Sequence, residues 1–137
     1  RYSDAYMVNW ASNVFPGILG RTCDRPCEPA CRRSRVEGNS GAPPEPVAIC
    51  RLKRVAADMK GDISARMPQV AEPNGLRVAR VGAGPASLTV ARDLVPLGYA
   101  VTVFDAEPKA GGFIRSQIPR FRLPESVISL QFDHKRL

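Results

Sequence analysis

The feature that most constrains this chain is a glycine-rich turn between a strand pattern and a helix pattern. Residues 76–81 (LRVARV) predict a strand, residues 82–87 (GAGPAS) a tight turn, and residues 88–98 (LTVARDLVPLG) a helix that stops at its glycine. Residues 99–105 (YAVTVFD) predict a second strand. A strand, a crossover helix and another strand in this order predict a parallel βαβ unit, so the expected fold class is α/β.

The spacing within the turn, G-x-G-x-x-S, is that of a dinucleotide-binding turn. Gly82 permits the tight turn, and Gly84 lets backbone N–H groups approach a pyrophosphate at the helix N-terminus, where the dipole favours negative charge. Ser87 is small enough for close helix–strand packing, although Gly or Ala is usual there. Asp105 ends the second strand, where an acidic side chain hydrogen-bonds a ribose hydroxyl. The alternative is a glycine turn that binds nothing.

Arg80 departs from the usual pattern of the first strand. In a parallel sheet this strand is normally buried on both faces and wholly apolar. An unpaired charge in that position is costly, so we expect Arg80 to reach either a carboxylate or solvent.

Four cysteines form the second feature, three of them spaced as C-x3-C-x3-C and one remote. They are Cys23, Cys27, Cys31 and Cys50. Zinc modules more often use C-x2-C or C-x4-C pairs with histidine, and the single histidine, His134, is distant in sequence. Cubane iron–sulfur clusters take four thiolates, often three close together and one remote. Spacing alone leaves iron–sulfur, zinc, disulfides and packed core residues open, and Cys50 is the least certain ligand because it falls on an expected helix.

Positive charge surrounds the cysteines and runs through the whole chain. Four arginines beside the cysteine pattern would offset the negative charge of a cluster: Arg21, Arg25, Arg32 and Arg33. The formal net charge is +7, but the arginines are spread over many segments with few aromatic residues among them, and no nucleic-acid-binding motif is present. We therefore expect no nucleic-acid partner; an acidic protein face or a phosphate fits the charge equally well.

The composition is that of a soluble folded domain, with 44% hydrophobic and 24% charged residues. No apolar run approaches the ~20 residues that a membrane-spanning helix needs, and no secretory signal is visible. We therefore expect a cytoplasmic protein in a reducing environment, where patterned cysteines bind metal or do redox chemistry more often than they form disulfides.

The N-terminal part is expected to be helical. Residues 2–14 predict a helix closed by Pro16 and Gly17, and a Cys- and Arg-rich loop follows it. The Gly/Pro/Ser-rich stretch at 37–46 predicts an exposed loop. Residues 47–59 then predict another helix, with these apolar side chains at helical spacing: Ile49, Leu52, Val55 and Ala56.

Three regions are therefore expected. Residues 1–60 would form a helical cysteine-rich domain, residues 61–75 a linker with at most a short helical turn, and residues 76–137 a partial Rossmann-like nucleotide-binding unit.

Taken together, the cysteine pattern and the glycine turn resemble the small (beta) subunit of NADPH-dependent glutamate synthase and its relatives. Those relatives include the N-terminal part of dihydropyrimidine dehydrogenase and the large subunits of ferredoxin:NADP oxidoreductases. The resemblance covers about residues 13–128. The matching positions are Asn13, Pro16, Gly20, Arg21, Cys23, Cys27, Glu28, Cys31, the 82–87 turn, Asp105, Gly111, Gly112 and the stretch IPRFRLP.

In that family an N-terminal helical domain binds [4Fe–4S] clusters, a second domain binds FAD and a further domain binds NAD(P)H. The resemblance implies that Cys23, Cys27 and Cys31 are cluster ligands. Cys50 is less secure, because some relatives have another residue there. The FAD-binding residues that it implies are Gly82, Gly84, Pro85, Ala86, Ser87, Asp105, Gly112 and Arg115. The turn would lie along the pyrophosphate, and Asp105 would hold the adenosine ribose.

The resemblance also implies what this chain lacks. Relatives usually carry another cysteine group upstream, and they add a pyridine-nucleotide domain with its own glycine turn. Here the match fades after LPESVI, and no second glycine fingerprint follows. We therefore expect a fragment or a subunit that depends on a larger oxidoreductase partner or on the remainder of a longer chain, with the NAD(P)H site supplied elsewhere.

The leading hypothesis is an electron-transfer module that passes electrons between FAD and a [4Fe–4S] cluster on the four cysteines. No catalytic acid or base is assigned, because electron transfer between these cofactors needs none. The alternatives are a non-catalytic iron–sulfur subunit that docks a larger oxidoreductase, and a zinc-stabilised binding module.

Overall fold

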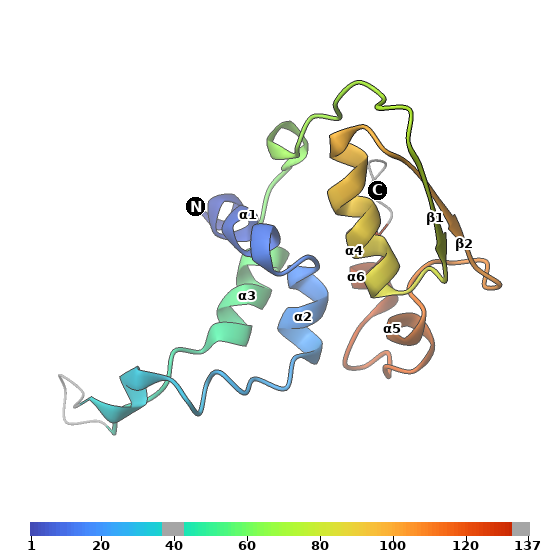
Figure 1. Cartoon of the computed structure of the whole chain (residues 1–137). Coiled ribbons are helices and arrows are strands. Elements are labelled where there is room, and N and C mark those ends of the chain that lie inside the picture. The colour runs from blue at the N-terminus through green and yellow to red at the C-terminus, as the bar shows by residue number, and fades with distance from the viewer. Residues whose placement is uncertain (37–42, 133–137) are drawn as a thin grey trace. The chain divides into compact units, whose positions relative to one another are not determined.

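The structure, a computed structural model, describes residues 1–36 and 43–132. It divides the chain into two compact units, Arg1–Asp62 and Ile63–Leu137 (Figure 1). Of the loop expected at 37–46, residues 37–42 lie outside the described part, and 43–45 are exposed. Every helix in the described residues is too short or too polar to cross a lipid bilayer.

The first unit is helical. Its elements are α1 (Tyr2–Ser12), α2 (Pro16–Thr22), a short 3-10 helix η1 (Arg32–Arg35) and α3 (Ile49–Asp58). The helix expected near the N-terminus is present, but the prediction that Pro16 and Gly17 close it is wrong. α1 ends at Ser12, and Pro16 is the first residue of α2. Proline is favoured there because its missing N–H is not needed and its fixed φ suits a helix.

α3 confirms the helix expected after Pro46, but most of the apolar side chains at helical spacing are not buried. Leu52 is 58% exposed and Val55 43% exposed. The buried side chains are Cys50, Lys53, Ala56 and Ala57. α3 packs against both α1 and α2, and small side chains at the contact let helix axes approach closely. The large apolar residues are therefore turned outward, and only Ala56 of the predicted set is buried.

The second unit contains the predicted βαβ unit. Its elements are η2 (Ser64–Arg66), β1 (Arg77–Val81), α4 (Pro85–Leu94), η3 (Val95–Leu97), β2 (Ala100–Phe104), α5 (Phe113–Ser116) and α6 (Glu125–Phe132). The strands pair in parallel with Arg77 opposite Ala100 and Val81 opposite Phe104. α4 connects them, as Figure 1 shows. The unit's core includes Leu123 and Ile128, both fully buried.

The two-stranded sheet is open on one face. Along each strand, exposed and half-buried residues alternate. Val81 is 90% exposed and Phe104 57% exposed, so the expectation that the first strand is buried on both faces is wrong. Arg80 lies on the half-buried face, and its buried Nε has no hydrogen-bond partner in the described residues. With only two strands in the sheet, few side chains are available to enclose it.

The segment before β1 is fastened to the second unit by backbone hydrogen bonds. The N–H of Ala71 donates to the Pro96 carbonyl at 3.0 Å, and that of Asn74 to the Gly98 carbonyl at 3.1 Å. The short helical turn expected between residues 61 and 75 is η2. The residues just before the sheet therefore share the structure of the second unit.

Candidate functional site

The glycine turn in the second unit joins β1 to α4. Gly82 has φ +90°, a conformation that side-chain-bearing residues rarely adopt, and Gly84 is the N-cap of α4. Pro85 takes the first helical position, where proline is favoured. A Cβ added at Gly82 or Gly84 would meet no atom within 4 Å. The outer side of the turn is therefore open to a ligand.

The first turn of α4 presents backbone donors to this open side. Pro85 has no N–H, and the N–H of Leu88 donates to the Gly84 carbonyl at 3.1 Å. The N–H groups of Ala86 and Ser87 have no acceptor in the described residues. Unpaired N–H groups at the positive end of a helix dipole are suited to an anion such as a pyrophosphate.

Asp105 connects the ends of the two strands. One of its carboxylate oxygens accepts a hydrogen bond from the N–H of Ala83, and the other accepts from Glu107 at 2.7 Å. These bonds, that of Ala83 first, lower the pKa of Asp105. An ionised carboxylate keeps further acceptor sites on each oxygen, so Asp105 can hold the turn and still accept from a sugar hydroxyl.

The segment after β2 returns to the same turn. The N–H of Gly111 donates to the Ala83 carbonyl at 2.8 Å. Gly112 has φ +50°, and a Cβ on it would lie 3.1 Å from the Cα of Gly84. Only glycine fits there without displacing the turn. The glycine turn, Asp105 and the Gly111–Gly112 pair, which are separate in sequence, therefore meet at Ala83 and Gly84.

Arg115 lies just beyond, but its guanidinium is already engaged. Its Nε donates to the Ala110 carbonyl at 2.7 Å, and it forms an ion pair with Glu125, which also binds Arg120 at 3.0 Å. The structure brings together seven of the eight residues predicted to bind FAD: Gly82, Gly84, Pro85, Ala86, Ser87, Asp105 and Gly112. Arg115 is directed to Glu125 and Ala110, and the binding roles of all eight stay predictions.

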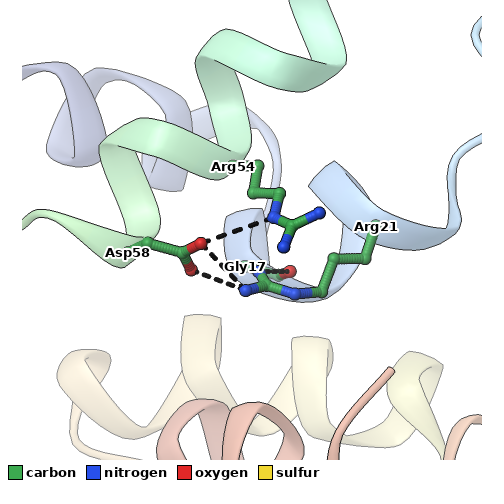
Figure 2. A network of polar contacts seen from close by, with 4 residues as sticks. All are labelled: Gly17, Arg21, Arg54 and Asp58. Carbon is green, nitrogen blue, oxygen red and sulfur yellow. Dashed lines mark hydrogen bonds and ion pairs between the residues drawn. The ribbon is translucent and has the colours of Figure 1, made fainter. Parts of the chain in front are cut away.

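In the first unit, α2 and α3 are fixed against each other by an ionic clamp (Figure 2). The Arg21 guanidinium donates to the Gly17 carbonyl at 3.0 Å and to both carboxylate oxygens of Asp58 at 2.9 Å. Arg54 adds a contact to Asp58 at 3.4 Å. The side chain of Arg21 is only 8% exposed. The clamp therefore sets how α2 and α3 align along their lengths.

Close backbone contact between the helices supports the same alignment. A Cβ added at Gly20 would lie 2.8 Å from the backbone nitrogen of Arg54. Three residues beyond Gly20, Cys23 caps the C-terminal end of α2, and Cys50 lies in the first turn of α3. The two thiols lie close enough for each to shift the pKa of the other. α2 and α3 therefore run antiparallel. The Arg21–Asp58 ion pair joins them at one end of their contact, and Cys23 and Cys50 are neighbours at the other end.

The two thiols of this pair have different surroundings. The backbone N–H of Arg25 donates to the Cys23 sulfur at 3.4 Å, and this bond is the main cause that lowers the pKa of Cys23. Burial, followed by the contact with Cys23, raises the pKa of Cys50. Of the two, Cys23 is therefore the thiol whose ionised form is favoured.

Glu28 ties the cysteine-rich loop to α3. One of its carboxylate oxygens accepts from the backbone N–H of Cys50 at 3.1 Å. The first N–H groups of a helix have no partner within the helix, and a negative charge there is favourable. Glu28 therefore caps α3 and holds the loop beside Cys50. Glu28 is one of the positions that carry the family resemblance, but nothing in the sequence pattern predicts this capping role.

The other two cysteines are not part of this pair. Cys27 is exposed and Cys31 half-buried. Backbone N–H groups, that of Val47 first and then that of Arg33, lower the pKa of Cys31. Within residues 1–36 and 43–132, no three cysteine, histidine or acidic side chains are grouped closely enough to hold a metal ion. The structure therefore assembles two of the four predicted ligands.

Lys53 is a feature of this site that sequence analysis missed. It lies on α3, three residues after Cys50, and is 7% exposed. Its positive charge favours the thiolate form of both cysteines, but less strongly than the Arg25 N–H acts on the pKa of Cys23 or burial acts on the pKa of Cys50. The only available signal was a lysine one helical turn from a cysteine on the same face of an expected helix.

The residues present fit a thiolate-bound group in their chemistry. The Cys23 sulfur accepts a backbone N–H bond, as cluster-bearing sulfurs do, and nearby backbone N–H groups lower the pKa of Cys31. A buried cation beside Cys23 and Cys50 matches a negatively charged group. A four-ligand set would need Cys27 and Cys31 to join the pair.

Known proteins are similar to this chain both in its nucleotide-binding motif and over nearly its whole length. Residues 81–134 match the NAD(P)-binding Rossmann-like domain family. The glutamate synthase [NADPH] small chain of Mycobacterium tuberculosis is 35% identical over 99% of this chain, and the NADP(+)-dependent formate dehydrogenase subunit beta of Moorella thermoacetica is 34% identical over 97%. This chain is a relative of the glutamate synthase small chain. The resemblance inferred from its motifs is thereby confirmed.

A third protein similar to this chain extends the comparison. The NAD-dependent dihydropyrimidine dehydrogenase subunit PreT of Salmonella typhimurium is 34% identical over 85% of this chain. All three relatives are named as subunits or chains of NAD- or NADP-dependent enzymes. The chain spans 21% of the formate dehydrogenase subunit and 27% of each of the other two.

Proposed function

We propose that the chain is an electron-transfer module of an NAD(P)H-dependent oxidoreductase, with a [4Fe–4S] cluster on its first unit and the ADP half of FAD on its second. The observation that carries the proposal is the meeting of Cys23 and Cys50 across α2 and α3. It occurs in a chain that is 34–35% identical to NAD- or NADP-dependent enzyme subunits. A pair of sulfurs brought from opposite helices is the start of a thiolate-ligated site.

In the first unit, the bound cluster would supply one-electron chemistry. The chain's own residues hold the sulfurs in place for it. The Arg21–Asp58 clamp and the contact at Gly20 fix α2 against α3, and this alignment positions Cys23 and Cys50. The Arg25 N–H stabilises the thiolate form of Cys23. Cys27 and Cys31 complete the proposed ligand set.

In the second unit, bound FAD would supply the redox chemistry of its flavin ring. The N–H groups of Ala86 and Ser87 would hold its pyrophosphate at the positive end of α4. Asp105 would accept the hydroxyls of the adenosine ribose, and Gly112 leaves the turn uncovered. The nicotinamide cofactor and the final acceptor would bind elsewhere in the assembly.

A second candidate is a docking subunit that holds a cluster but no flavin. The ion pair between Arg115 and Glu125 favours it, because this guanidinium is not free to meet a flavin phosphate. In this function the second unit would serve only to dock a larger oxidoreductase.

The optical spectrum of the anaerobically purified chain tests the proposal, together with its iron, sulfide, zinc and flavin contents. We expect broad absorbance near ~400 nm that dithionite bleaches, as thiolate-ligated iron–sulfur centres give, and structured flavin bands once FAD is added. A cluster with no flavin bands would favour the docking subunit. A colourless chain that contains zinc after reconstitution with iron and sulfide would overturn both and support a zinc-stabilised binding module.

A further inference from the structure

Lys53 is a buried cation without a carboxylate partner. Its side chain projects from the middle of α3 and is 7% exposed. Within residues 1–36 and 43–132, neither a hydrogen bond nor an ion pair joins it to an acidic group. An ammonium group removed from water is costly unless negative charge compensates it.

Of the acidic residues near this site, Asp24 beside Cys23 is exposed to solvent, and the other two are already engaged. Glu28 caps α3 through the N–H of Cys50 and lies 4.0 Å from Arg25. Asp58 accepts from Arg21 and Arg54 at the other end of the helix. Cys50 lies one helical turn before Lys53 on the same buried face of α3. The charge of Lys53 accordingly favours the thiolate forms of Cys50 and of its neighbour Cys23.

The compensating charge must therefore come from the sulfur site itself. We propose that Lys53 is the internal counter-ion of the group bound at Cys23 and Cys50, and that its charge makes this group easier to reduce. The proposal rests on the cluster of the proposed function. Reduction adds an electron to an already negative thiolate-ligated centre, and a fixed cation in a medium of low dielectric constant stabilises the added charge. Net charge is among the factors that set cluster potentials.

Lys53 acts here as a positioned charge, so its removal should change the potential of the bound group. Lys53→Met keeps the length of the side chain and removes the charge, whereas Lys53→Arg keeps the charge. Because methionine suits a buried position, the cluster-free variant should fold and melt at or above the temperature of the wild type. Arg51→Met is the matched control, because Arg51 is next to Cys50 on the same helix but exposed. Solvent screens its charge.

The test compares the wild type, Lys53→Met, Lys53→Arg and Arg51→Met after anaerobic reconstitution with iron and sulfide. Iron and sulfide contents are measured first, and then the midpoint potential in a dye-mediated redox titration followed by visible absorbance. We expect the reduced-to-oxidised equilibrium of Lys53→Met to fall by roughly tenfold, a shift of about 59 mV for one electron. Lys53→Arg and Arg51→Met should stay near the wild type.

The experiment distinguishes failure of the proposed function from failure of the role proposed for Lys53. If the wild type takes up no cluster, the proposed function fails and takes this inference with it. If all four proteins load equally and share one potential, the cluster stands and the role of Lys53 is overturned. An equal shift in Lys53→Met and Arg51→Met would also overturn it, since the effect would then be one of overall charge.

Discussion

At the glycine turn of the second unit, backbone hydrogen bonds hold three segments together, whereas in the first unit only Cys23 and Cys50 of the four predicted ligands meet. The turn is built from main-chain groups whose geometry follows from glycine and proline. The cysteine site depends on side chains from a loop, and a bound metal group is itself the crosslink that gathers such ligands. The proposed nucleotide site is thus preformed in a chain whose proposed metal site is half assembled.

The strongest test of this comparison concerns the cysteines. Cys50→Ser should lower the iron content after reconstitution about as much as Cys27→Ser does, although Cys50 is paired and Cys27 exposed. The expected loss exceeds tenfold, because even an outer-shell partner contributes about 10–100-fold to metal affinity. Iron and sulfide assays measure it. Full iron retention in Cys50→Ser would mean that another group supplies the fourth position.

The next test breaks the alignment of the helices that carry the cysteine pair. Gly20→Ala places a Cβ 2.8 Å from the backbone nitrogen of Arg54, and overpacking of this kind costs about 1–3 kcal/mol. Urea unfolding followed by the fluorescence of Trp10, the single tryptophan, reports on the first unit. Gly61→Ala is the control, since its Cβ would meet only the Ser3 hydroxyl at 3.8 Å. Equal stability of both variants would contradict the close contact.

A smaller effect is expected at the ionic clamp. Asp58→Asn leaves the buried Arg21 guanidinium without its carboxylate and should destabilise the first unit by about 1 kcal/mol. This is below the usual value for a charged hydrogen bond because Asp58 is partly exposed. The same fluorescence-detected unfolding measures it. Asp4→Asn, which breaks the exposed pair with Arg1, should change little. If both variants lost a similar free energy of unfolding, the Arg21–Asp58 ion pair would be no more stabilising than the exposed Arg1–Asp4 pair.

The mildest test addresses the preformed turn. The pKa of Asp105 in the folded chain is lowered by the N–H groups of Ala83 and Glu107, so it lies below the value of about 3.9 in the unfolded chain. Its contribution to stability is then present above pH ~4 and is lost as the pH falls through the folded-state pKa. The melting temperatures of the wild type and Asp105→Asn, followed by circular dichroism, should differ at pH 7 and converge in acid.

Two measurements complete the test of Asp105. Asp93→Asn is the control, because that exposed carboxylate pairs with the neighbouring Arg92 and not with the turn. Asp105→Ala should also weaken FAD binding while leaving the iron content intact. A constant difference in melting temperature across the acid range, or an unchanged FAD affinity, would count against the role of Asp105.

The same contrast explains what sequence could predict. The βαβ unit and the positive φ of Gly82 follow from local rules, because a strand, a tight turn and a helix in order leave few conformations for the glycine. The start of α2 at Pro16 was missed, since proline both ends and begins helices. Which side chains of α3 are buried, Lys53 included, depends on how closely α1 and α2 pack against α3. Hydrophobic periodicity carries no information on that distance.

The open face of the β1–β2 sheet affects how this chain will behave at high concentration. Within residues 1–36 and 43–132, no further strand pairs with the outer edge of β1 or of β2, and apolar Val81 and Phe104 are exposed on the open face. Unprotected edges of this kind are templates on which a second molecule can add strands, and sheets this small are only marginally stable. Self-association through this sheet should therefore limit the solubility of the isolated chain, and a lysine in place of Val81 is the direct way to raise it.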